Sequence, residues 1–358
     1  MDIPFSEGEK KALTAILSKH APDVMNLNPD FSAILSSKGT LIDMNTMLTP
    51  QEKASYLPIA WQACSLKDPP QTFGLPWYLT SAVTYSNTTL LKQAGLHTVP
   101  KTETELLKLA QVLKKTGHAD AFFPTLAENG RFLKMLHQSG IPLQDELGRY
   151  VFAKHGAGKA LAFWVGMYEK GYLPKEALTQ GHQDVMDRYQ SGSLAMFVAG
   201  TTALGSVEKN APEVFKQTQV SPQFPDNPKK SSNPDFSVMT LVVPKTTTHP
   251  KEAVALALAL TNAKNTLAFS KLAPILPPNT QALKQSVVTV NHRNLLDEAR
   301  YLSAMQLLHS NSAFQIHPRQ KSVNQIMDFY VQSALLGKLS AEEAMQQAQD
   351  KINKTLRN

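Results

Sequence analysis

The sequence has few of the residues and patterns that mark the commonest functional classes. Its 358 residues include one cysteine, Cys64, which excludes an internal disulfide and a cysteine-built metal cluster. No apolar run approaches the ~18 residues that a membrane-spanning helix needs. The chain starts Met1-Asp2-Ile3-Pro4-Phe5, with neither a basic segment nor an apolar core, so it shows no secretory signal. Taken alone, these absences would assign the chain to the cytoplasm.

Motifs of common enzymes are also missing. The sequence contains no GxSxG, no phosphate-cradling GxxxxGK[ST], no GxGxxG after a strand and no HExxH. Its ten histidines show no helical metal-ligand spacing with a carboxylate. The formal charge is +7 and the pI about 9.2, but the lysines are scattered and form no basic stripe with interleaved aromatics. We therefore expect no cofactor, no metal and no nucleic-acid partner.

What is present indicates a globular α/β protein. A hydrophobic fraction of 42% supports real cores, and 18% charged residues is too low for a disordered chain. The length favours two domains. Expected strands and helices alternate along the chain, which predicts mostly parallel sheets flanked by helices. The proline-rich segment 221–235 is predicted to be a loop or a linker between domains.

The segment Pro22–Phe31 (PDVMNLNPDF) predicts a short buried strand that ends in a polar turn. Pro29 cannot donate to a strand ladder, so pairing should stop there. Asn28 and Asp30 then follow the carboxyl end of a strand, where open α/β sheets bind their ligands. A turn built from common turn residues explains the same pattern, and both interpretations stay open.

A second informative segment is TFGLPWYLTSAVTYS, residues 72–86. Trp77 and Tyr78 stand beside Thr80 and Ser81, and an aromatic face next to hydroxyls suits a sugar. Aromatic core packing is the alternative. The half Ser81–Ser86 is rich in residues that favour strands.

Two further polar groups follow expected strands. Glu128, Asn129 and Arg131 lie at a strand-to-helix junction, where they either cap a helix or face a ligand. The run Gly200–Thr202 opens a helix whose free N–H groups could bind a ligand oxygen.

Taken in this order, these segments resemble the extracytoplasmic sugar-binding proteins of ABC importers, the family of maltose-binding-protein-like receptors. The resemblance also rests on YQSGSLAMFVAGTTALGSVEKNAP and LVVPKTTTHPKEAVALALALTNAKNTLAFSKL, and it covers essentially the whole chain. It implies a two-lobed periplasmic-binding-protein type II fold, α/β, with discontinuous domains. A sugar would bind in the cleft between lobes that close about a hinge, and a separate membrane ATPase would drive transport.

The resemblance implies the following sugar-binding residues: Asn28, Asp30, Trp77, Tyr78, Thr80, Ser81, Glu128, Asn129, Arg131, Gly200, Thr201 and Thr202. This chain departs from the family at three positions. Thr80 replaces a glutamate of some relatives, and Thr201 and Thr202 follow Gly200 where a cleft aromatic or glutamine is usual. Asn324 falls roughly where relatives carry a stacking aromatic. The cleft is therefore expected to be more polar than a maltodextrin cleft, which favours a small glycoside.

Lobe 1 is predicted to comprise residues 1–86 and 237–285, and lobe 2 residues 87–236 and 286–358. In this family an export signal, a strand, a helix and a second strand precede the point that matches Met1. We therefore hypothesise that the N-terminus is truncated, and we expect this chain to fold poorly unless it is extended upstream.

The sequence thus predicts a monomeric, non-enzymatic, periplasmic or extracytoplasmic receptor. It would bind a disaccharide or small glycoside of the maltose, trehalose, sucrose or glucosylglycerol class and deliver it to membrane permease subunits. One alternative is a glycoside-acting enzyme with Asp30 and Glu128 as its carboxylates. Another is a receptor of the same fold for a polyamine or a different non-sugar solute.

Overall fold

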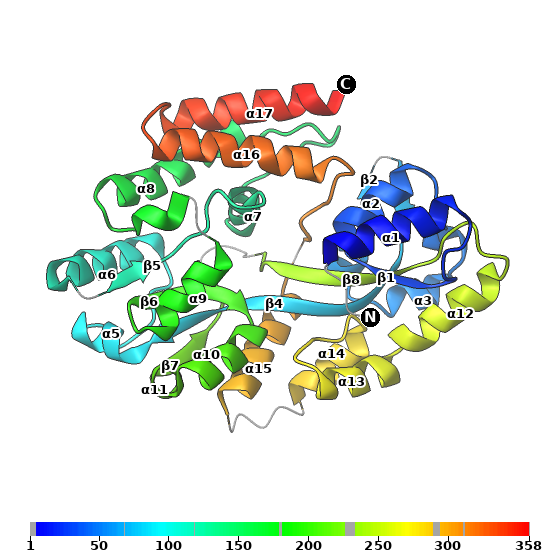
Figure 1. The fold of residues 1–358 in the computed structure, drawn as a ribbon, viewed down its shortest axis with the longest axis horizontal. Helices are drawn as coiled ribbons and strands as arrows, with labels where there is room; N and C mark the ends of the chain where they lie inside the picture. Colours follow the sequence, from blue (N-terminus) through cyan, green and yellow to red (C-terminus); the bar gives the residue numbers. More distant parts are fainter. Residues whose placement is uncertain are drawn as a thin grey trace. The chain divides into compact units, whose positions relative to one another are not determined.

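The computed structural model describes residues 5–67, 69–117, 119–178, 181–225, 233–288, 294–310 and 312–357. The chain divides into two compact units (Figure 1). Unit 1 comprises Met1–Thr80, Phe236–Val290 and Leu307–Gln320, and unit 2 comprises Ser81–Asp235, Asn291–Gln306 and Lys321–Asn358. The sequence-based division differs mainly at 307–320, which was expected in the second lobe but makes its contacts in unit 1. Within the described ranges, no helix is both long enough and apolar enough to cross a membrane.

Unit 1 contains a small sheet covered by short helices. Its elements are α1 (Phe5–Leu17), β1 (Met25–Leu27), α2 (Pro29–Ser37), η1 (Met44–Thr46), α3 (Pro50–Ala54), α4 (Pro58–Ala63), the β2–β3 hairpin (Ser65–Lys67 and Pro70–Thr72), the start of β4 (Leu75–Asn87), β8 (Phe236–Val242), α12 (Pro250–Thr261), α13 (Ala263–Leu272) and α14 (Thr280–Val288).

The strand order β1–β8–β4 places β8 at the centre of this sheet. β1 pairs with β8 antiparallel, with Met25 opposite Val242 and Leu27 opposite Thr240. Gly74 comes so close to β8 that an added Cβ would lie 2.8 Å from the carbonyl oxygen of Leu241, so only glycine fits there. The apolar faces of β4, β8 and α12 pack together and form the core of unit 1.

Unit 2 contains the remaining strands and the longer helices. Its elements are the rest of β4, α5 (Thr88–Gln93), α6 (Glu103–Thr116), β5 (Asp120–Phe122), α7 (Arg131–Gln138), η2 (Phe152–His155), α8 (Ala157–Glu169), η3 (Lys175–Leu178), α9 (His182–Gln190), β6 (Leu194–Gly200), α10 (Thr202–Asn210), α11 (Pro212–Lys216), β7 (Thr218–Ser221), most of α15 (Leu295–Leu308), most of α16 (Gln320–Leu335) and α17 (Ala341–Arg357).

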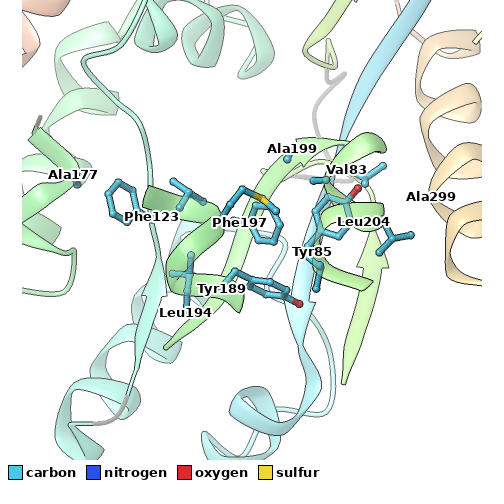
Figure 2. Close-up of a cluster of buried hydrophobic side chains, with 14 residues drawn as sticks. Val83, Tyr85, Phe123, Ala177, Tyr189, Leu194, Phe197, Ala199, Leu204 and Ala299 are labelled. Atoms are coloured by element: carbon cyan, nitrogen blue, oxygen red, sulfur yellow. The ribbon is translucent and has the colours of Figure 1, made fainter. Parts of the chain in front are cut away.

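The core of unit 2 is built on β4 and β6 (Figure 2). The rings of Tyr85 and Phe197 stack 4.8 Å apart, and Tyr189 of α9 lies 4.5 Å from Phe197 between ring centroids. Both buried tyrosines keep a hydrogen bond, because the Tyr85 hydroxyl donates to the carbonyl of Gly200 and the Tyr189 hydroxyl bonds to Thr218. This core fixes the position of β6 and of the loops that follow it.

A helical layer of unit 2 forms from segments far apart in the sequence, because α8 packs along α17. Ala348 and Ile352 are among the buried positions of α17, which packs on both α8 and η2. Gly158 permits the close approach, since an added Cβ would lie 2.9 Å from the Cα of Glu342. Asn353 then bonds the backbone of Tyr150 through both its amide oxygen and its amide nitrogen, at 2.8 and 2.9 Å.

The α/β class is confirmed, but the strand directions differ from the predicted mostly parallel sheets. Of the strand pairs whose direction the structure describes, β5 and β6 pair in parallel. β4 runs antiparallel to β6 and to β7, and β1 runs antiparallel to β8. The reason is the 13-residue strand β4, which continues from unit 1 into unit 2 and runs against β6 and β7. A parallel pair forms at β5 and β6, where the helices between these two strands bring the chain back to run in the same direction.

Candidate functional site

The recess of interest in unit 2 lies at the carboxyl ends of β5 and β6, the parallel pair. It has a volume of about 160 Å³. Its lining is largely aromatic and apolar with a few polar groups, namely Phe122, Phe123, Pro124, Thr125, Arg131, Met135, His182, Val185, Val198 and Phe224. Ligands of open α/β sheets bind at this end of the strands, so the position itself favours a binding function.

The floor of the recess is continuous with the core of unit 2. Phe123 and Val185 belong to the core cluster around Phe197 and also line the recess. Phe122 lies 5.4 Å from Phe224 and 5.9 Å from Trp164, measured between ring centroids. The rings are thus held by packing on several sides, which preorganises an apolar surface for a ligand.

Arg131 is the predicted site residue that lines this recess, and it supplies its permanent positive charge. It begins α7, and its guanidinium makes an ion pair with Asp235. The ammonium of Lys134, one turn later, lies 3.6 Å from the same carboxylate. Burial raises the pKa of Asp235, but the charges and hydrogen bonds of Lys134 and Arg131 outweigh it and leave the pKa below its ordinary value. The pair therefore stays ionised at neutral pH and orients the guanidinium.

His182, the first residue of α9, was not singled out in the sequence and brings an imidazole to the recess. Glu128, which was predicted, lies next to it. An added Cβ at Gly181 would lie 2.6 Å from the Glu128 carboxylate, so this side chain rests against the start of α9. The Glu128 carbonyl accepts from the N–H of Arg131 at 2.9 Å. Glu128 thus lies between two groups that line the recess.

Asn129 and Gly130 form the turn that leads into α7. Both adopt left-handed backbone conformations, with φ of +50° and +68°. The N–H of Gly130 donates to the carboxylate of Asp328 on α16 at 3.0 Å. The prediction for this junction left helix capping and ligand binding open, and the structure shows that the turn is itself held by another helix.

The predicted run Gly200–Thr202 ends β6 and starts α10. The carbonyl of Gly200 accepts from the Tyr85 hydroxyl at 3.0 Å. Thr201 is 4% exposed, whereas Thr202 is exposed. None of the three is among the residues that line the recess, and of the two threonines only the exposed Thr202 offers a hydroxyl at the surface of unit 2.

The predicted aromatic residues of unit 1 gather with a residue that sequence reasoning missed. Trp77 stacks on Phe269 of α13 at 5.4 Å with 19° between the ring planes, and Tyr78 meets Phe269 edge-on at 6.1 Å. Trp77 and Tyr78 are half-buried. Burial raises the pKa of Tyr78, and a hydrogen bond with the Asn26 side chain opposes this shift. The cluster is compatible with both aromatic core packing and sugar binding, because the rings pack on one another and keep part of their surface exposed.

The remaining predicted residues have structural contacts of their own. Asn28 is the N-cap of α2 and accepts from the N–H of Phe31 at 2.7 Å, so Pro29 and Asp30 form the first helical turn instead of a free turn. Asp30 is exposed, and Thr80 is partly buried. Ser81 is 2% exposed, and its hydroxyl lies 3.5 Å from the carbonyl of Asp235.

The chemistry of a catalytic or metal centre is not assembled by the described residues. Among them, no three His, Cys, Asp or Glu side chains gather as metal ligands. Cys64 is fully buried, and burial raises the pKa of its thiol well above the ordinary value. The thiol is therefore protonated and unreactive at neutral pH.

Some of the missed residues carry a signal that sequence reasoning can use. Phe122 ends β5, and Phe123 and Thr125 come just after it, at the end of a strand where ligands bind. The polar cluster at 128–131 drew the prediction away from them. His182 and Phe224 carry no local signal, because each reaches the recess from a distant segment of the chain.

Sequence and structure comparisons identify the family and the fold of this chain. A sequence profile of the family "Bacterial extracellular solute-binding protein" matches residues 1–266. A search of curated protein sequences gives no significant match. The crystal structure of a putative oligosaccharide periplasmic-binding protein from Synechococcus sp. MITs9220 is 33% identical, with a TM-score of 0.85 over 99% of this chain and 90% of that one. The sugar-binding protein MalE from Xanthomonas citri is 22% identical, with a TM-score of 0.82 over 100% and 89% of the two chains, which shows the shared fold.

These matches confirm the predicted two-lobed α/β binding-protein fold, the extracytoplasmic location and the absence of enzymatic activity, so the glycosidase alternative is discarded. The chain belongs to the family of bacterial extracellular solute-binding proteins.

Proposed function

We propose that this chain is the sugar-binding component of an ABC importer and that its solute is a disaccharide or a similarly small glycoside. Maltose, trehalose, sucrose and glucosylglycerol represent this class. The observation that carries the proposal is the recess of unit 2, where three phenylalanine side chains and Arg131 line one cavity at the ends of β5 and β6. A pyranose has an apolar face that packs on aromatic rings and hydroxyls that accept from a guanidinium.

The similar proteins support a sugar as solute. The Synechococcus relative is described as a putative oligosaccharide-binding protein. A structural neighbour from Staphylococcus aureus was solved in complex with maltose, at 16% identity. The small volume of the recess, about 160 Å³, favours one sugar ring over a long chain in this unit.

In this proposal Arg131 donates to sugar hydroxyls, and the exposed carboxylate of Glu128 accepts from them. Trp77 and Tyr78 offer a ring face in unit 1, with Phe269 behind Trp77. The predicted roles of Asn28, Asp30, Thr80, Ser81, Asn129 and the run Gly200–Thr202 stay predictions, as does closure of the lobes about a hinge.

The charge of the recess opposes the polyamine alternative. Its lining, as far as the structure describes it, contains Arg131 and His182 but no carboxylate. A polycation in the recess would meet the Arg131 guanidinium, and the Asp235 carboxylate nearby is already paired with that guanidinium and with Lys134.

A thermal-unfolding scan against a ligand panel tests the proposal. Maltose, trehalose, sucrose, glucosylglycerol and spermidine are each added in excess. A ligand at 100 times its dissociation constant stabilises the folded state by about 2.7 kcal/mol. For a chain of this size that raises the midpoint by a few degrees. A shift with one or two sugars supports the proposal. A shift with spermidine alone, or no shift in a protein that melts cooperatively, overturns it.

A further inference from the structure

Helix α16 contacts the turn before α7 through two side chains on one of its faces. Asn324 and Asp328 are four residues apart and therefore lie on the same side of the helix. The carboxylate of Asp328 accepts from the N–H of Gly130 at 3.0 Å and also from the N–H of Asn129. These N–H groups precede α7 and have no partner within that helix, so the carboxylate satisfies them from outside.

Asn324 fixes the same turn by close packing. An added Cβ at Gly130 would collide with the side-chain amide of Asn324, so any other residue there requires the Asn324 side chain to move. Gly130 also has a φ of +68°, and Asn129 before it has +50°. A left-handed pair of this kind is unfavourable for most residues and persists because its surroundings hold it.

The turn leads directly to the groups that line the recess. Arg131 follows Gly130 and is the first residue of α7. On the other side of the turn, the backbone carbonyl of Glu128 accepts from the N–H of Arg131, and the Glu128 carboxylate rests against Gly181, which precedes His182. A rotation of the 129–130 peptide units would redirect Arg131 and release Glu128 from its position. The direction of both charged side chains therefore depends on the contacts that α16 makes.

We propose that Asp328 is a positioning residue for the solute site, and that with Asn324 it holds the Asn129–Gly130 turn so that Arg131 and Glu128 face the ligand. The ligand in this inference is the sugar of the proposed function, whereas the positioning role of Asp328 rests on the contacts described above. Asp328 itself does not line the recess.

We call the contacts of Asp328 and Asn324 with the Asn129–Gly130 turn the clamp, and the clamp also responds to pH. Burial raises the pKa of Asp328 to about 6, the backbone N–H groups of Gly130 and Asn129 oppose the shift, and the charge of Glu128 adds to it. Glu128 is the charged group that acts on Asp328 from the turn. On its own helix, Asn324 is uncharged, and the Gln332 amide one turn later donates to the carbonyl of Leu178 in η3. Protonation converts a charged acceptor into a weaker one, so the clamp loosens as the pH falls through about 6.

The test combines calorimetric binding with nuclear magnetic resonance on the full chain. Maltose, trehalose, sucrose and glucosylglycerol are titrated into the wild type, Asp328→Ala and Asp328→Asn from about pH 5 to about pH 8. Asp350→Asn on α17 is the matched control, since its carboxylate accepts only from Gln346 at the surface in the described contacts. In the wild type, affinity should fall several-fold below about pH 6. Asp328→Ala should bind about tenfold more weakly at neutral pH, and Asp328→Asn should lose the pH dependence.

A second readout separates this inference from the proposed function. In ¹⁵N-labelled wild type, the amide of Gly130 should titrate with a midpoint near pH 6, and this titration should vanish in Asp328→Asn but persist in Asp350→Asn. If no panel sugar binds, the proposed function fails, and the Gly130 titration alone decides on the clamp. A Gly130 amide that does not titrate, or an Asp328→Ala protein that binds sugar as the wild type does with the same pH profile, overturns the inference.

Discussion

The half-buried carboxyl of Asp328 has a measurable consequence for stability. Its pKa rises to about 6 in the folded protein from an ordinary 3.8, with burial as the main cause. An acid whose folded pKa is raised binds more protons when folded than when unfolded between these two values. The free energy of unfolding therefore decreases as the pH rises from about 4 to about 6 and stays lower above. An asparagine side chain has no charge that burial disfavours, so Asp328→Asn should stabilise the fold at neutral pH.

The size of this effect follows from the shift. A difference of about two pKa units corresponds to about 3 kcal/mol at the most. Asp328 is only partly buried, and solvent screening reduces the value to about 1 kcal/mol. In a cooperative unit of this size, that raises the unfolding midpoint by roughly 2 °C at neutral pH.

His137 provides a built-in contrast because its shift has the opposite consequence. Burial lowers its pKa to about 4, and the charge of Asp235 opposes the shift. A buried neutral histidine loses stability as the pH falls from its ordinary value near 6.5 towards 4. In the wild type, the contributions of Asp328 and His137 offset one another over this range. Asp328→Asn keeps only that of His137, so its unfolding midpoint should drop more steeply in acid.

The assay is a series of calorimetric melts of the wild type and Asp328→Asn from about pH 4 to about pH 8, with Asp350→Asn as control. The expected difference between the wild type and Asp328→Asn is about 2 °C at neutral pH and close to zero near pH 4. A constant difference across the range, or a destabilised Asp328→Asn protein at neutral pH, would refute the reasoning.

Three further predictions concern single residues. In urea melts, Gly130→Ala should lower the free energy of unfolding by about 2–4 kcal/mol, because the position combines a positive φ with a clash. Gly148→Ala is the control: its position has a positive φ but open space, so it should cost about 1 kcal/mol. Equal losses would contradict the packing argument. Arg131→Gln should weaken sugar binding about tenfold by calorimetry, while Arg149→Gln, which breaks an exposed pair with a nearby aspartate, should leave it unchanged; unchanged affinity in both would remove Arg131 from the site. Cys64 should react with an aromatic disulfide reagent only after denaturation, and a rapid reaction in the native protein would contradict its burial.

Local signals in the sequence predicted local structure well. Thr102 and Glu105, spaced as threonine and glutamate are in a capping box, form one at the start of α6, with the nitrogen of the Glu105 N–H 3.3 Å from the threonine hydroxyl, and Gly117 ends that helix in a left-handed conformation. Asn87, a residue type that favours the N-cap, caps α5. Such motifs are readable because donor and acceptor lie within four residues of each other.

The predicted turn at residues 28–30 shows where local reasoning is ambiguous. Asn, Pro and Asp are frequent in turns, but the same order also fits an N-cap followed by Pro at the first helical position. The structure contains the helix, with Asn28 as its cap. Apolar residues Phe31, Ala33 and Leu35, which are buried in α2, decide the outcome because the helix covers them.

Long-range contacts at the site could not be predicted from the sequence. Asp235 lies 104 residues from Arg131, and Asp328 lies 198 residues from Gly130. No local pattern links such pairs, since each forms only when distant strands and helices pack. The predicted polar cluster at 128–131 was therefore found without the two carboxylates that orient it.

The packing of α17 on α8 has a consequence for how the protein forms on the ribosome. The two helices are separated by roughly 170 residues of sequence. At a synthesis rate of about 5–20 residues per second, α8 waits on the order of ten seconds or longer before its partner exists. During this interval the side of α8 that packs on α17, which includes Gly158, stays uncovered on the nascent chain. Unit 2 therefore completes its fold late, and chaperones have time to act on this uncovered helix before α17 arrives.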